Sequence, residues 1–216
     1  MGELIALSIS AYIVAFSGAV MPGPLLTATV HESAGRGFSA GPLFIIGHGI
    51  LELLLLLVLL LGAAPILTNT IFFTCVSIVG GVIMGIMAFT MFLGIPKVVM
   101  PSASGSRMQG KLVFKGALLS LANPYWTIWW ATIGLSFLAA SRGYGFTGIV
   151  IFFTGHILGD LTWYGFISYI VSKGRRFLTD RRYKLLIAVC AGVLFVFAVL
   201  FIVRGLGKAL ETGLLG

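Results

Sequence analysis

Long runs of apolar residues, separated by short polar connections, dominate the hydrophobic pattern of this chain. A helix needs about 20 consecutive apolar residues to cross the hydrocarbon core of a bilayer. The runs that come close to this length predict six membrane-spanning helices, which are Leu4–Met21, Pro42–Gly62, Ile71–Gly94, Val113–Ala139, Phe146–Val171 and Leu185–Val203. The pattern therefore predicts an all-α integral membrane protein with six transmembrane helices.

The composition excludes a soluble domain. Hydrophobic residues make up 59% of the 216 residues and charged residues 9%, with a mean hydropathy of +1.10. Soluble domains average about 45–50% apolar and about 25% charged residues. A water-soluble fold of this size could not bury so much apolar surface.

The basic residues gather in the three connections that would share one side of the membrane if the chain crosses six times. Those residues are Arg36, Lys97, Arg107, Lys111, Lys115, Lys173, Arg175, Arg176, Arg181, Arg182 and Lys184. The other side would hold only Arg142, Arg204 and Lys208. The positive-inside rule then places the basic connections in the cytoplasm and both termini outside it. A distribution of this kind sets membrane orientation, so we predict no nucleic-acid partner.

Similar motifs recur in the same order in the two halves of the chain. Pro22-Gly23-Pro24 follows the first predicted span, and Asn123-Pro124 lies inside the fourth. A glycine and a histidine followed four residues later by an acidic residue occur in the second span and again in the fifth. Since each half has three spans, the second copy would be inverted relative to the first. Inverted repeats with broken helices are a recurring plan of transporters.

The predicted organisation is thus a single transmembrane domain over residues 1–216. It comprises two inverted three-helix repeats, at about 1–95 and 111–205, with helices 1 and 4 broken at their prolines. A basic cytoplasmic connection at 96–112 joins the repeats.

Two histidine–carboxylate pairs are the strongest candidates for function. His48 precedes Glu52 by four residues, and His156 precedes Asp160 by the same distance. A lone charge at this depth costs at least about 2.5–3.5 kcal/mol, and residues i and i+4 share one face of a helix. We therefore expect both pairs to face the interior near mid-membrane, as a binding or ion-coupling site. The alternative is that each polar pair only holds helices together.

Asn123 and Pro124 predict a helix break, because Asn is a good N-cap and Pro suits a first helical turn. The N–H groups freed there would suit the carboxylate of a substrate. Pro22, Gly23 and Pro24 would do the same in the first half. A plain kink, or a simple helix end, is the alternative for each. Trp126 directly follows the second break and is the aromatic residue that we expect in the pocket, while core packing accounts for most of the others.

Several motifs of enzymes and ATP-driven machines are missing. The chain contains no Walker A sequence, dinucleotide fingerprint, HExxH or GxSxG motif. Cys75 and Cys190 form no metal-binding spacing. We therefore expect a protein that is not an enzyme and that has no cofactor.

The proline motifs, together with Ala122-Asn123-Pro124-Tyr125-Trp126 and the helix around His156, Asp160 and Trp163, resemble the LysE-type translocator family of lysine, threonine and homoserine exporters. The likeness runs from about Leu4 to Val203. It implies a secondary amino-acid exporter in the cytoplasmic membrane, driven by an ion gradient, and leaves a homodimer open as its assembly. Familiar members often have Asn-Pro-Lys where this chain has Asn123-Pro124-Tyr125.

The leading hypothesis from these observations is an efflux carrier for an amino acid or a similar small molecule, with a proton as coupling ion. The half-helix starts would bind the substrate carboxylate, and Glu52 and Asp160 would bind its ammonium group or carry the proton. One alternative is a divalent metal-ion exporter, since two imidazoles and two carboxylates suit Zn²⁺ or Mn²⁺. Another is a membrane scaffold subunit that transports nothing.

Overall fold

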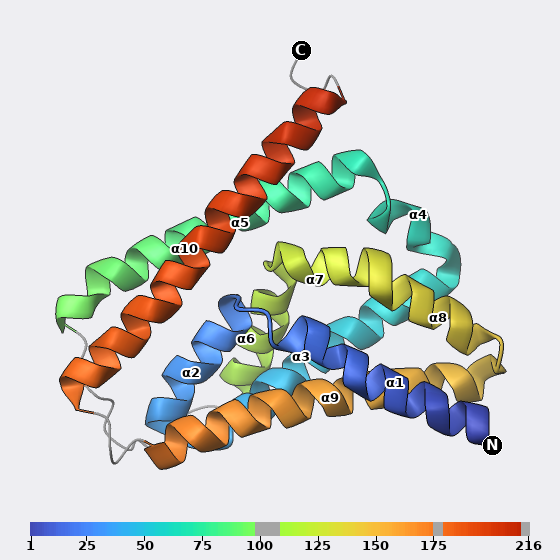
Figure 1. The fold of residues 1–216 in the computed structure, drawn as a ribbon, viewed down its shortest axis with the longest axis horizontal. Coiled ribbons are helices and arrows are strands. Elements are labelled where there is room, and N and C mark those ends of the chain that lie inside the picture. Colours follow the sequence, from blue (N-terminus) through green and yellow to red (C-terminus); the bar gives the residue numbers. More distant parts are fainter. Residues whose placement is uncertain (98–108, 175–178, 213–216) are drawn as a thin grey trace.

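The computed structural model describes residues 1–97, 109–174 and 179–212, and within these ranges its regular elements are all helices (Figure 1). Most of the predicted connection 96–112 lies outside the described residues, as do Arg107, Arg175 and Arg176. In the described part, five helical segments are long and apolar enough to cross a membrane, which are Gly2–Ala19, Ala40–Leu67, Thr70–Lys97, Gly145–Gly174 and Asp180–Glu211. The all-α membrane class is confirmed, whereas the predicted fourth span, Val113–Ala139, is not among these five segments.

The region predicted as the fourth span, Val113–Ala139, is divided into short helices. It runs as α6 (Gln109–Leu121), α7 (Pro124–Trp129), a π-helical turn at Trp130–Gly134 and α8 (Leu135–Arg142). The Asn123 side chain accepts the Tyr125 backbone N–H at 3.1 Å and so begins α7 in place of an intrahelical bond. The gap between α6 and α7 lies at Asn123-Pro124, where the sequence predicted a break in the fourth helix.

The predicted connection between the first two spans contains a helix of its own. After α1 (Gly2–Ala19), the chain passes through Gly23 in an extended conformation and enters α2 (Pro24–Arg36). Proline at the first helical position is favourable because its missing N–H has no intrahelical partner there. Helix α2 buries seven of its 13 residues, so tertiary packing stabilises a segment whose sequence is polar.

Two close helix contacts hold the core of the molecule together. Helix α3 (Ala40–Val58) packs on α6, and α9 (Gly145–Gly174) packs on α1. A Cβ at Gly47 would overlap the backbone of Val113, and a Cβ at Gly155 would lie 2.8 Å from the Ser8 carbonyl oxygen. Each glycine directly precedes a site histidine, so the close contact fixes where that histidine lies.

The pair formed by α5 (Thr70–Gly94) and α10 (Asp180–Glu211) lies to one side of the other helices (Figure 1). A Cβ at Gly81 would meet Ile202 at 2.8 Å, and a Cβ at Gly85 would meet Ala198 at 3.7 Å, so the Gly81-x-x-x-Gly85 sequence of α5 faces α10. Beyond α3, the chain kinks at Gly62, whose φ of 102° lies outside the helical region, and then enters α4 (Ala64–Leu67).

A surface ion pair joins α2 to α6. Lys115 Nζ donates to Glu32 Oε1 at 2.9 Å, and Arg36 Nε donates to Glu32 Oε2 at 2.7 Å. Partial burial of Glu32 acts to raise its pKa, but the hydrogen bonds and charges of Lys115 and Arg36 outweigh burial and lower that pKa below 4.5.

Candidate functional site

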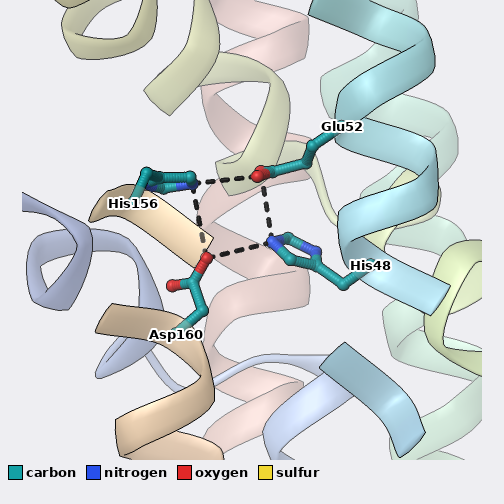
Figure 2. A group of neighbouring side chains, drawn as sticks. All are labelled: His48, Glu52, His156 and Asp160. Atoms are coloured by element: carbon teal, nitrogen blue, oxygen red, sulfur yellow. Dashed lines mark ion pairs between the residues drawn. The ribbon is translucent and has the colours of Figure 1, made fainter. Parts of the chain in front are cut away.

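Helices α3 and α9 each carry a histidine and a carboxylate on one face of a membrane-spanning segment. His48 and Glu52 belong to α3, and His156 and Asp160 belong to α9. All four are buried, with exposed fractions of 8%, 1%, 3% and 3% respectively. The two faces are turned toward each other, so all four side chains point into the same space (Figure 2).

These four residues, here called the quartet, form a closed ring in which histidines and carboxylates alternate (Figure 2). His48 Nε2 lies 3.1 Å from Glu52 Oε1 and 3.4 Å from Asp160 Oδ2. His156 Nε2 lies 2.9 Å from Glu52 Oε2 and 3.3 Å from Asp160 Oδ2. Each histidine therefore contacts both carboxylates, including the one on the opposite helix.

Two indole groups hold the Glu52 carboxylate from the side of α7. Trp126 Nε1 donates to Glu52 Oε1 at 2.9 Å, and Trp130 Nε1 donates to the same oxygen at 2.7 Å. The π-helical turn begins at Trp130, directly after α7. Two charge-assisted hydrogen bonds on Oε1 orient the carboxylate and leave Oε2 directed at His156.

The two histidines are supported differently. His48 Nδ1 is 2.8 Å from Ser120 Oγ, and that hydroxyl donates to the Gly116 carbonyl oxygen at 2.8 Å. Because the hydroxyl proton is already used, His48 Nδ1 must carry the proton that it shares with Ser120. His156 stacks on Trp129, with ring centroids 4.5 Å apart, and its Nδ1 has no hydrogen-bond partner in the part of the chain that the structure describes.

A small cavity of about 40 Å³ adjoins the quartet. The lining includes the four quartet residues and, around them, Gly18, Leu25, Ser120, Asn123, Trp126 and Tyr164. A water molecule occupies about 30 Å³ in the liquid. In this conformation the cavity can therefore hold an ion or a water molecule, and a whole amino acid would need a more open conformation.

The structure brings the two proline motifs together at one end of this cavity. A Cβ at Gly23 would lie 3.0 Å from the Asn123 side-chain amide nitrogen, so the two motifs are neighbours. Asn123 lines the cavity, whereas Pro22, Gly23, Pro24 and Pro124 do not line it. Those four residues position the starts of α2 and α7 and make no contact with the quartet that the structure records.

Four further residues belong to the site, namely three aromatic residues for which core packing was expected and one serine that was not predicted. Trp130, Ser120, Trp129 and Tyr164 all contact the quartet or line its cavity. A spacing of four residues from Trp126 to Trp130 could have indicated that both indoles share one face. No comparable signal marks Ser120, because a serine four residues after a glycine is common in packed membrane helices.

The quartet has the donor atoms to bind a cation and to release it again. Buried carboxylates and imidazoles must be paired or must coordinate an ion, because an isolated charge in this environment is costly. The quartet offers one nitrogen or oxygen from each residue, and these four atoms all lie within 4.8 Å of one another. Imidazole and carboxylate together are a donor set for a divalent transition metal, and the carboxylates alone suit an ammonium group.

Comparison with known proteins supplies one match. A family model described as LysE type translocator matches residues 16–205, which is most of the chain. No curated protein and no solved structure matches the chain.

Proposed function

The chain belongs to the LysE type translocator family, and from that premise we propose that it is a secondary active carrier that exports an amino acid or a similar small molecule. A translocator moves a solute across a membrane and does not transform it. Our proposal adds the cargo class, the driving gradient and the residues that carry them.

The observation that carries the proposal is the buried quartet at the contact between α3 and α9. Glu52 and Asp160 would bind the ammonium group of the cargo or carry the coupling proton, with His48 and His156 as their partners. The Asn123 side-chain amide lines the cavity and lies beside Gly23, which precedes the start of α2, and it would bind the cargo carboxylate there.

The contact pattern supports two inverted repeats. Helix α1 packs on α9, the helix of the second half that carries His156, and α6 packs on α3, the helix of the first half that carries His48. The first helix of each half therefore pairs with the histidine helix of the other half. Such reciprocal pairing is expected when a two-fold axis relates the two halves. Rocking of the halves about that axis would open the quartet first to one side of the membrane and then to the other.

We further propose that the protein lies in the cytoplasmic membrane with both termini outside the cytoplasm, the orientation that the basic connections favour. The lipid bilayer would contact the apolar side chains that the helices leave exposed, such as Ile86 and Phe89 on α5.

Transport in liposomes tests the proposal. The purified protein would be reconstituted, the vesicles loaded with labelled amino acids, and efflux followed under an imposed pH gradient. We expect Glu52→Gln and Asp160→Asn to slow efflux about tenfold or more, because a hydrogen bond to a charged group contributes about 1.5–3 kcal/mol.

Glu211→Gln is the matched control, since this glutamate is exposed and bonds only to Lys208 among the described residues. Its efflux should equal that of the parent. Parent-like efflux in both quartet variants would remove the carboxylates from the mechanism, and a parent that moves no amino acid would exclude this cargo class.

A further inference from the structure

We propose that the quartet is a binding site for one divalent first-row transition-metal ion of the zinc class. The proposal deepens the proposed function by naming the ion that the site takes, and rests on it only for the role of that ion in transport.

The donor atoms have the separations that such an ion requires. Zinc binds four ligands tetrahedrally at about 2.0–2.2 Å, which places neighbouring ligand atoms roughly 3.3–3.6 Å apart. Among His48 Nε2, His156 Nε2, Asp160 Oδ2 and Glu52 Oε2, the recorded nitrogen–oxygen separations are 3.4, 3.3 and 2.9 Å. His48 Nε2 lies 3.1 Å from the other Glu52 oxygen, Oε1. All four donor atoms lie within 4.8 Å of one another, so a small contraction across the ring would complete a four-ligand site.

Three of the buried donor atoms lack a hydrogen-bond partner in the described part of the chain. They are Glu52 Oε2, His156 Nε2 and Asp160 Oδ2. Each is close to another ring atom, but these contacts do not have hydrogen-bond geometry. A buried polar atom without a partner is costly. A metal ion at the centre of the ring would satisfy all three atoms together.

The surrounding side chains direct the remaining donor atoms toward the same centre. Ser120 holds the protonated Nδ1 of His48, which leaves Nε2 to present its lone pair to the ring. Trp126 and Trp130 both donate to Glu52 Oε1, which leaves Oε2 for the ion. Metal-binding histidines and carboxylates usually have outer hydrogen-bond partners of this kind, which fix their orientation.

Charge and donor type select the class of ion. Two carboxylates balance the two charges of a divalent ion, so the loaded site is neutral in an interior where net charge is costly. Calcium prefers six to eight oxygen ligands, and magnesium prefers an octahedral shell with several waters. Two imidazoles in a four-donor site therefore favour a transition metal such as Zn²⁺ or Co²⁺.

Metal binding to the purified full chain in detergent tests the proposal. Zn²⁺ would be titrated by calorimetry, and Co²⁺ by its visible absorption, which reports tetrahedral coordination. We expect one saturable equivalent per chain, with a change in tryptophan fluorescence because Trp129 stacks on His156. Asp160→Asn should weaken binding at least tenfold, and Ser120→Ala about 10–100-fold through loss of an outer partner.

His31→Gln is the matched control, because His31 is the third histidine of the chain and lies exposed on α2, outside the quartet. It should bind as the parent does. If Asp160→Asn does not fold, the affinity of the Ser120→Ala variant for the metal ion tests the proposal in its place. No saturable binding by the folded parent, or equal affinity in the parent and the Asp160→Asn and Ser120→Ala variants, would overturn the proposal.

Failure here is distinguishable from failure of the proposed function. Amino-acid efflux without metal binding would leave the carrier proposal standing and exclude the metal site. Metal binding without amino-acid efflux would support the metal site and exclude the amino-acid cargo.

Discussion

The two histidine–carboxylate pairs have the same spacing and comparable burial, yet they are supported by different neighbours. The pair on α3 has three outer hydrogen-bond partners, two indoles on Glu52 and one hydroxyl on His48. In the described residues, no indole donates to Asp160, and His156 is held by ring stacking. Equal sequence motifs have therefore produced unequal surroundings.

The asymmetry arises from the helices that pack on each pair. Val113 of α6 lies against Gly47, and Ser8 of α1 lies against Gly155. Seven residues beyond Val113 comes Ser120, whereas seven residues beyond Ser8 comes Ala15, which has no hydroxyl to offer. The α3 pair is thus fixed in position, and the α9 pair has more freedom to rearrange. We infer that motion during transport would involve the α9 pair more than the α3 pair.

Removal of each carboxylate provides the strongest test of this comparison. Breaking a buried ion pair by deleting one partner costs about 3–5 kcal/mol, so Glu52→Ala should lower the free energy of unfolding by this amount. The loss of unfolding free energy in Asp160→Ala should be about 1–3 kcal/mol smaller, because this change leaves no indole N–H group without its acceptor. Unfolding of the purified variants in detergent, followed by circular dichroism, measures both changes. Equal losses would mean that the indole groups contribute nothing to the difference.

The two indole donors can be tested separately. Trp130 is fully buried, so Trp130→Phe should cost about 1.5–3 kcal/mol through loss of a hydrogen bond to a charged group, and Trp126→Phe should cost less because Trp126 is only partly buried. The same unfolding measurement reports both changes. Trp163→Phe is the control, because the Trp163 indole N–H is buried without a hydrogen-bond partner among the described residues. A loss in that variant as large as in Trp130→Phe would assign the effect to packing instead.

Much of this molecule could be predicted from local sequence signals. Run length and apolar content predict where the membrane helices lie, because the bilayer imposes one length on all of them. The four-residue spacing of His48 and Glu52, and of His156 and Asp160, predicts two pairs that each share a helix face. These predictions depend on neighbours along a single helix, and the structure has both pairs on helices.

Features that depend on contacts between distant segments could not be predicted in this way. Helix α2 is stabilised by burial of a polar sequence, in a segment that was predicted to be only a connection. The closure of two pairs into one ring requires α3 and α9 to meet, and Trp130 and Ser120 reach the ring from other segments. No periodicity within one helix contains that information.

A third pair with the same spacing, Glu32 and Arg36 on α2, provides a surface reference for the two buried pairs. Its partner Lys115 is half exposed, so Glu32→Gln should lower the free energy of unfolding by at most about 1 kcal/mol. The pKa of Glu32 is lowered in the folded protein, so this contribution is present above pH 4.5 and is lost as the pH falls through the lowered pKa.

Salt should separate the surface pair from the quartet. Exposed ion pairs are screened at high ionic strength and buried ones much less, so the Glu32→Gln loss should shrink in about 1 M salt while the Glu52→Ala loss persists. Unfolding at two salt concentrations, between pH 4 and pH 7, measures both effects. If the loss of unfolding free energy in Glu32→Gln does not depend on salt or pH, this glutamate acts through packing on α6. It would then not serve as an electrostatic reference for the buried pairs.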